Sequence, residues 1–114
     1  MRLNKTGYLF SPRTIMRDEN GKVVYDDMGR PVYIEGKADI PFKFKWEPFS
    51  PELAKTTYGI STIDTRYRLF TRVDDRLATN VEFVYYGYKY KIQYPLKFDK
   101  HYEILVSQNG EYTA

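Results

Sequence analysis

The amino-acid sequence predicts an all-β protein, mainly antiparallel, that carries one short helix. Two long stretches, Ile40–Glu47 and Thr62–Arg72, alternate apolar and polar residues with a period of two, which is the pattern of half-buried strands. Two further apolar stretches, Val81–Tyr86 and Tyr88–Tyr94, are separated by a single glycine and predict a tight hairpin. At 114 residues, the chain is expected to form one domain.

A duplicated motif near the N-terminus predicts a protruding β-arm over residues 18–35. The motif D-[DE]-x-G-[KR]-x-V-Y begins at Asp18 and again at Asp26. Each copy predicts a turn, in which glycine supplies a positive φ, followed by a short strand. A calcium loop is the alternative, but the acids lack EF-hand spacing and its bidentate glutamate, so ordinary turns are favoured. The candidate contact residues of the arm are Asn20, Gly21, Tyr25, Met28, Gly29 and Tyr33.

A short helix is predicted over residues 51–58, between the two alternating strands. Ser50 is a favourable N-cap, and Pro51 occupies the first helical position, where proline is tolerated. Gly59 ends the helix after two turns. The sequence therefore predicts a strand–short helix–strand excursion in an otherwise all-β chain.

The two strands beside this helix have distinct faces. The first is expected to bury three aromatic residues, Phe42, Phe44 and Trp46. The second alternates an apolar face with a basic one. Arginines on one strand face can contact phosphates, or they can face solvent or another subunit, and both interpretations stay open. The candidate subunit- or DNA-facing residues of this basic strand are Arg66, Arg68, Phe70 and Arg72.

The predicted hairpin is rich in tyrosine and lysine. Aromatic residues interleaved with cations can stack with the bases of a single nucleic-acid strand. Here Tyr88 and Tyr90 alternate with Lys89 and Lys91, so the rings and the cations lie on opposite faces, which favours an ordinary tyrosine-rich sheet. The last strand is predicted at His101–Val106, followed by a loose C-terminal tail over residues 107–114.

The composition argues against catalysis. The chain has no cysteine and one histidine, His101, so it contains neither a thiolate nucleophile nor a histidine cluster for a metal. No nucleophile-elbow or phosphate-binding glycine motif occurs. We therefore expect no enzymatic activity, no metal and no cofactor. The net charge of +3 is of mixed sign along the chain and indicates no dedicated nucleic-acid arm. No stretch resembles a signal peptide or a membrane span, so an intracellular protein without membrane contact is expected.

Three features occur together in a known family. A serine-led helix ending in Tyr58-Gly59 lies between two strands, the turn Asp74–Leu77 follows, and Val81–Ile92 has the pattern V-x-F-V-Y-x-G-x-x-Y-x-I. Over residues 38–106 the chain resembles the head-closure proteins of tailed bacteriophages, also called stopper or head–tail joining proteins. The resemblance implies a small β-barrel subunit that forms a ring beneath the portal complex. Such a ring joins the DNA-filled head to the tail and helps to retain the packaged DNA.

The resemblance also implies partners and a location. The partners are further copies of the chain, portal or adaptor proteins above, tail-terminator or tail proteins below, and packaged double-stranded DNA, contacted without sequence preference. The location is the neck of the virion, assembled in the host cytoplasm. In this family the segment between the two central strands, here residues 49–62, can point into the channel, so its side chains are expected outside the subunit core. Its candidate channel- or partner-facing residues are Ser50, Glu52, Leu53, Lys55 and Tyr58.

Two other functions stay open at this point. An oligonucleotide-binding β-barrel would share the mild basicity and the many aromatic residues. A tail-terminator subunit of the same phage neck would differ mainly in its position along the neck.

Overall fold

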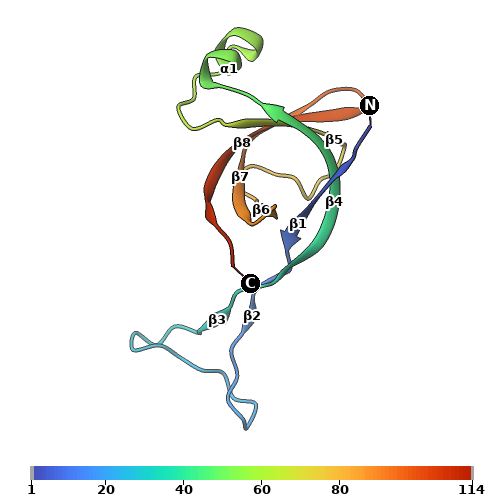
Figure 1. The fold of residues 1–114 in the computed structure, drawn as a ribbon. Coiled ribbons are helices and arrows are strands. Elements are labelled where there is room, and N and C mark those ends of the chain that lie inside the picture. The colour runs from blue at the N-terminus through green and yellow to red at the C-terminus, as the bar shows by residue number, and fades with distance from the viewer. Residues whose placement is uncertain (1, 114) are drawn as a thin grey trace.

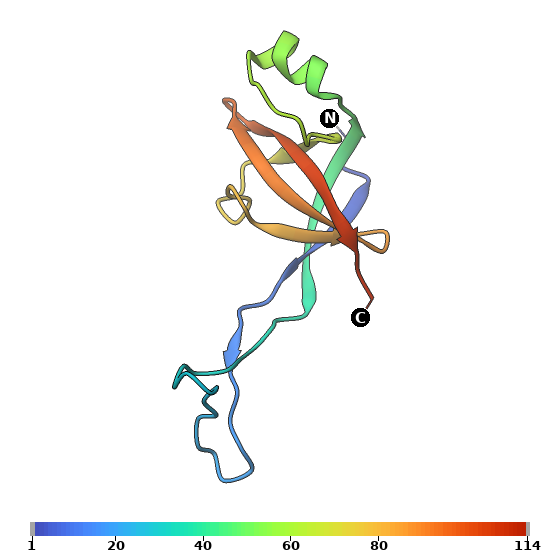
Figure 2. The same ribbon diagram turned by 90° about the vertical axis from the view of Figure 1, so that its left-hand side faces the viewer.

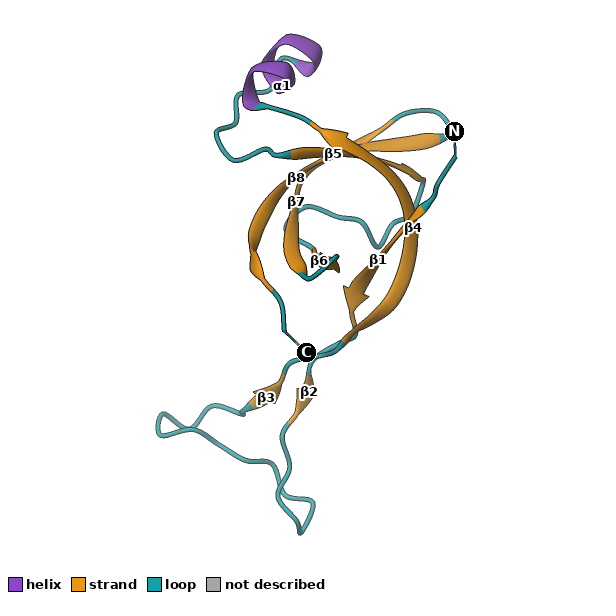
Figure 3. Cartoon of the chain, viewed as in Figure 1, coloured by secondary structure: helices purple, strands orange, loops and turns teal. Residues whose placement is uncertain are grey.

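The computed structural model describes residues 2–113, which form a closed β-barrel with one helix and one projecting arm (Figures 1 and 3). In chain order the elements are β1 (Lys5–Phe10), β2 (Thr14–Ile15), β3 (Tyr33–Ile34), β4 (Ala38–Pro48), α1 (Pro51–Tyr58), β5 (Tyr67–Arg72), β6 (Glu82–Tyr85), β7 (Tyr88–Lys97) and β8 (His101–Glu111).

Six strands close the barrel in the order β1-β4-β5-β8-β7-β6, and β6 pairs back with β1 through Val84 and Tyr8. Neighbouring barrel strands are all antiparallel. The predicted fold class is therefore confirmed: the protein is a small, mainly antiparallel all-β barrel. One short helix lies between β4 and β5, and a β-arm lies between β1 and β4.

The barrel is filled by residues that strand alternation directs to one side. Phe42 and Phe44 of β4 are buried as predicted. Trp46 continues their face, and its ring stacks on that of Tyr67 with centroids 4.2 Å apart. Leu77 comes from the loop between β5 and β6 and joins the core from outside any strand. The buried core consists of Leu9, Phe42, Phe44, Leu69, Leu77, Phe83, Tyr90, Ile92, Tyr102, Ile104 and Val106.

The hairpin between β6 and β7 turns at Tyr86 and Gly87, whose φ angles are 53° and 82°. Positive φ at both central residues defines a type I′ turn, whose twist matches that of the flanking strands. Glycine adopts this conformation without steric cost. The tight hairpin predicted around this glycine is confirmed.

Two predicted boundaries are wrong. The strand predicted over Thr62–Arg72 begins only at Tyr67, because the residues after α1 form an irregular return to the barrel. The loose tail predicted over residues 107–114 is also wrong, since β8 continues to Glu111, which pairs with Tyr88. Pairing with the start of β7 holds this polar stretch extended despite its weak strand propensity. Ala114, the last residue of the predicted tail, lies outside the described residues.

The arm, residues 11–37, leaves the barrel between β1 and β4 (Figure 2). Its base is a two-stranded sheet in which Thr14 pairs with Ile34 and Ile15 with Tyr33. No residue from 11 to 37, all of them described, is buried. The arm accounts for the elongated shape of the molecule, which measures 55 × 28 × 27 Å, and it contributes nothing to the barrel core.

Candidate functional site

The caps of helix α1 are those that the sequence predicts. Ser50 Oγ accepts a hydrogen bond from the backbone N–H of Leu53 at 3.2 Å. Gly59 ends the helix in the left-handed region, with φ at 71°. The candidate residues Glu52, Leu53 and Lys55 are exposed, and Leu53 exposes 47% of its surface. The outer side of α1 is therefore free to contact a partner.

The inner side of this segment packs on the barrel, which corrects one expectation. Phe49 and Ala54 are buried against Leu105 of β8 in a cluster separate from the barrel core. Leu105 lies between Ile104 and Val106, which point into the barrel, so its own side chain points outward. The expectation that the segment lies wholly outside the subunit core is therefore wrong for Phe49 and Ala54.

A polar network around Arg68 fastens the end of α1 to the outer face of the barrel. Tyr58 Oη donates a hydrogen bond to Glu103 Oε1 and accepts one from Arg68 Nη1 at 2.9 Å. Arg68 Nε donates to Glu47 Oε1 at 2.8 Å. His101 Nε2 lies 2.9 Å from Glu103 Oε2. Tyr58, which was predicted to face the channel, is half-buried and holds the helix in place.

Burial and hydrogen bonding shift the ionisation of this network. Burial raises the pKa of Tyr58, and its hydrogen bond to Glu103 raises that pKa further. Burial disfavours the charged form of Glu103, but hydrogen bonds from Tyr58 and His101 outweigh it and lower the pKa of this carboxyl. Arg68 remains a cation, because hydrogen bonds to Glu47 and Tyr58 outweigh its burial and raise its pKa. The network therefore holds the charged guanidinium of Arg68 between the carboxylates of Glu47 and Glu103.

The four residues of the predicted basic strand do not form one surface. Arg68 is paired with Glu47 and Glu103, and its guanidinium lies 4.8 Å from the ring centre of the half-buried Phe70. Arg66 lies before β5, and its Nη1 donates to the carbonyl of Thr65 at 3.1 Å. Arg66 and Arg72 are both exposed, at opposite ends of β5, and neither forms an ion pair with any residue from 2 to 113.

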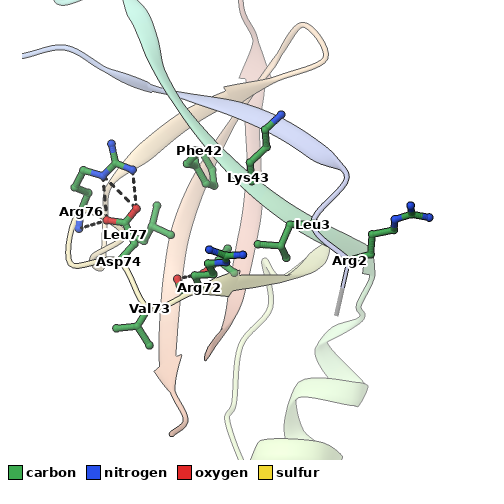
Figure 4. Close-up of a pocket in the computed structure, with 10 residues that line it drawn as sticks. Arg2, Leu3, Phe42, Lys43, Arg72, Val73, Asp74, Arg76 and Leu77 are labelled. Carbon is green, nitrogen blue, oxygen red and sulfur yellow. Dashed lines mark hydrogen bonds and ion pairs between the residues drawn. The ribbon is translucent and has the colours of Figure 1, made fainter. Parts of the chain in front are cut away.

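A second basic group, which the sequence analysis missed, surrounds Arg72 at a pocket of about 540 Å³ (Figure 4). Arg76 is bound to Asp74 there at 2.7 Å. The remaining cations come from segments far apart in the chain, which is why composition and motifs did not reveal the group. Only the register between β4 and β5 could have indicated this group in advance. Because Lys45 pairs with Phe70, continuing the same register places Lys43 opposite Arg72. The charged lining residues are Arg2, Lys43, Arg72, Asp74 and Arg76.

The candidate residues of the arm lie on its two turns, on β3 and, for Tyr25, in a bridge with Pro31 before the second turn. Tyr25, Met28 and Tyr33 expose 60%, 77% and 47% of their surfaces. Gly21 and Gly29 have φ angles of 80° and 77°, as predicted for the turn glycines. These residues therefore present apolar and aromatic surface away from the barrel.

The duplicated motif forms the same hydrogen-bonded turn twice. Asp18 Oδ1 accepts from the backbone N–H groups of Asn20 and Lys22 at 2.9 and 3.0 Å. Asp26 Oδ1 accepts from the equivalent groups of Met28 and Arg30, both at 2.9 Å. The hydrogen bond from the Arg30 backbone is the main cause that lowers the pKa of Asp26. The first acid of each motif is thus occupied by its own turn, as the preferred interpretation requires.

Within residues 2–113, no group of three or more histidine, aspartate or glutamate side chains could hold a metal ion. In the same part of the chain, no helix has the length and apolar character needed to cross a membrane. Comparison with models of known protein families and with curated proteins returns no match. The geometry itself defines a class, namely a small closed β-barrel with two projections, α1 and the arm, that expose apolar side chains.

Proposed function

We propose that this protein is a head-closure subunit of a tailed bacteriophage, with a structural and non-enzymatic role. It forms part of the neck ring that joins the DNA-filled head to the tail and helps to close the DNA channel. Its partners are further copies of the chain, portal or adaptor proteins on one side and tail proteins on the other. It acts in the virion neck, where it meets packaged DNA without sequence preference.

The observation that carries the proposal is a closed barrel with two projections at opposite ends. Figures 1 and 2 place α1 at one end and the arm at the other. A barrel with a filled core is a rigid body, whereas exposed apolar patches mark contact sites. This arrangement suits a subunit that binds one neighbour above and another below. Six exposed large apolar residues lie on the arm: Ile15, Met16, Tyr25, Met28, Tyr33 and Ile34.

The α1 segment suits a channel-closing element because few contacts fasten it. It is held by the Phe49–Ala54–Leu105 cluster and by the hydroxyl of Tyr58. Segments with few buried contacts open at lower free energy than the strands of a core. Displacement of α1 would break the Tyr58 hydrogen bonds and expose Phe49, Ala54 and Leu105, but these residues lie outside the barrel core, so the segment can change position without unfolding the barrel.

An oligonucleotide-binding barrel is the second candidate. It is favoured by the turn between β6 and β7, where Tyr86 and Tyr88 expose 86% and 38% of their surfaces beside Lys89. Two observations weigh against it. The oligonucleotide-binding fold is a five-stranded barrel, whereas six strands close this one. Tyr90, at the centre of the tyrosine cluster, exposes only 3% and is not free to stack with a base.

The test is reconstitution with the products of the neighbouring genes. The purified protein is mixed with portal and tail proteins encoded beside it, and the complexes are examined by native mass spectrometry and electron microscopy. A ring of this protein bound to the portal complex is the expected result. Binding to the tail tube alone would indicate a tail terminator. Binding to neither, with tight single-strand binding that is lost in Tyr88→Ala, would favour the oligonucleotide-binding barrel.

A further inference from the structure

The net charge of the chain is divided between two unlike parts. Residues 14–35, which make up the arm from β2 to just beyond β3, carry three basic and five acidic side chains, whereas the remainder carries fifteen basic and ten acidic ones. This outer part of the arm is therefore acidic and the barrel basic, whereas the whole arm, residues 11–37, carries five charges of each sign because Arg13 and Lys37 lie at its base. Opposite charges on separate parts of one molecule favour association of the outer arm of one copy with the barrel of another.

The second turn of the arm combines a free carboxylate with an apolar side chain. Asp26 is engaged by its own turn and by Arg30, whose Nε lies 3.3 Å from Asp26 Oδ2. Asp27 is exposed and forms no ion pair with any described residue. Met28 beside it exposes 77% of its surface, the highest value among the large hydrophobic residues of the arm. Arg30 Nη2 donates a hydrogen bond to Met28 Sδ at 3.4 Å, so this turn offers a partner one carboxylate and one exposed methionine whose sulfur contacts Arg30.

The pocket around Arg72 offers the complementary surface. Arg2, Lys43 and Arg72 form no ion pair within residues 2–113, and Lys43 Nζ donates only to Thr6 Oγ1 at 2.5 Å. Leu3 and Val73 line the same pocket, whose volume of about 540 Å³ admits a methionine side chain. Figure 4 shows Arg72 and Leu3 at the centre of this pocket and Val73 at its margin.

We infer that the second turn of the arm, residues 26–29, docks in this pocket on another copy of the chain. Met28 then packs against Leu3 and Val73, and Asp27 lies beside Arg72. The inference rests on the proposed ring and names the contact that builds it. Because the two surfaces differ, the contact is head-to-tail, and such contacts form rings when the rotation between copies closes.

The geometry of a single chain is consistent with a contact between copies. The pocket includes Arg2 and Leu3, which precede β1, and the arm begins after β1 ends at Phe10. β1 therefore separates the two surfaces, and the arm extends away from the barrel (Figure 2). The docking turn of one copy must reach the pocket of its neighbour.

Disulfide cross-linking tests this contact directly, because the chain has no cysteine of its own. The variant Met28→Cys/Val73→Cys, oxidised mildly in the free protein and in portal-bound complexes, should form a ladder of linked multimers. A mixture of the two single variants should give only dimers that contain one chain of each, because each pair has one linkable contact. The matched control is Tyr86→Cys/Val73→Cys, whose first cysteine lies on the β6–β7 hairpin at a site as open to solvent as that of Met28. It should cross-link only at background level.

Charge reversal tests the electrostatic part of the contact. Asp27→Lys in the cross-linking variant should cause loss of the ladder, and adding Arg72→Glu should restore part of it. Raising the ionic strength should lower the yield in the parent variant. Asp75→Lys, which reverses an exposed acid on the β5–β6 loop, is the matched control and should retain the ladder.

The outcomes separate this inference from the proposed function. Portal-bound rings without cross-linking above the Tyr86→Cys control would overturn the contact and leave the neck function standing. Specific cross-linking without any portal binding would support the contact and overturn the neck function. If no cross-link forms and Arg72→Glu abolishes binding to duplex DNA, the pocket is a phosphate site and the inferred contact is wrong.

Discussion

Tyr90 packs its phenol ring among the aromatic rings of the barrel. Its ring stacks on Phe83 with centroids 5.5 Å apart and meets Trp46 and Tyr67 edge-on, each at 5.7 Å. Burial is the main cause that raises the pKa of Tyr90 to about 12, and the neighbouring tyrosines add to it. Ionisation of this single side chain is therefore coupled to the stability of the whole barrel.

This coupling predicts a specific loss of stability in alkali. The unfolded chain should ionise Tyr90 near pH 10, so the contribution of its raised pKa is complete below that pH and is lost as the pH rises through about 12. Across this window the free energy of unfolding should fall by about 2–3 kcal/mol more in the wild type than in Tyr90→Phe. Urea denaturation at several pH values measures the difference, and parallel curves for the two proteins would contradict it.

Tyr58 provides a second prediction at the residue scale. Tyr58→Phe removes the hydroxyl shared by Arg68 and Glu103 but keeps the ring that contacts Phe49. We expect a loss of about 1–2 kcal/mol, the usual cost of a lost partially buried hydrogen bond, and faster amide hydrogen exchange confined to α1. The exposed Tyr25→Phe is the control and should leave exchange unchanged. Faster exchange in the barrel strands as well would show that Tyr58 supports more than the helix.

The same network predicts that α1 loosens in acid. Because the pKa of Glu103 is lowered in the folded protein, its contribution is present above its unfolded pKa of about 4.3 and is lost as the pH falls through the lower folded value. The protection factors of the α1 amides, which are corrected for the intrinsic pH dependence of exchange, should therefore fall in acid before those of the strands, and Glu103→Gln should remove this difference. A simultaneous fall in both regions would show that this network does not hold α1 in place.

At the scale of elements, the parts that could be predicted from sequence are those with local causes. The alternation of β4, the caps of α1 and the glycine of the β6–β7 turn each lie within a few residues of the feature they determine. The arm could be predicted for the same reason, since each motif copy closes its own turn. The sequence does not distinguish the unpaired Asp27 from Asp26, which is bound within its own turn, because that distinction depends on side-chain hydrogen bonds.

Elements and sites that depend on pairing between distant strands could not be predicted. The end of β8 is held by the start of β7, and a register shift between Ile92 and Tyr94 turns Tyr94 outward, where 37% of its surface is exposed. Of the candidate site residues, Glu52, Leu53 and Lys55 are exposed as a contact surface requires. The pairing of Arg68 with carboxylates and the gathering of cations around Arg72 both follow from strand register.

Replacement of residues 52–57 by a glycine-serine linker tests the role of α1 as an element. Only Ala54 is buried within this stretch, and a flexible loop of similar length is entropically inexpensive. We expect the subunit to fold with a loss below that of Leu69→Ala, which should cost roughly 2–5 kcal/mol as a truncation in the core. Thermal unfolding followed by circular dichroism compares the two variants.

The two changes should have the opposite order of effect on particle assembly: the linker replacement, which is expected to cost less stability than Leu69→Ala, should impair assembly more. If α1 closes the channel, the linker variant should fold yet fail to give tail-joined, DNA-retaining particles in a complementation assay. Unfolding of the linker variant would show that α1 is an obligatory core element. Full complementation would show that the segment is a passive connection between β4 and β5.

At the scale of the whole molecule, the arm and the barrel are energetically separate. Because residues 11–37 bury nothing, replacing residues 13–35 by an Asn-Gly turn should change the free energy of unfolding by less than about 1 kcal/mol, as expected for exposed loops. The same variant should lose assembly with its neighbours. Denaturant titration measures the first quantity and native mass spectrometry the second, and a large loss of barrel stability would contradict this separation.

Closure of the barrel has a further consequence for assembly. Each of its six strands has a neighbour on both sides, so no barrel strand lies at a free edge along its whole length, although parts of several strands, β7 and β8 among them, are paired on one side alone. Free edges act as templates on which other chains add strands, and this is a common route to aggregation. A subunit with few such edges is expected to remain soluble while it accumulates. In any assembly of copies, we expect the contacts to be made by side chains and by the arm, without extension of the barrel sheet from one copy to the next.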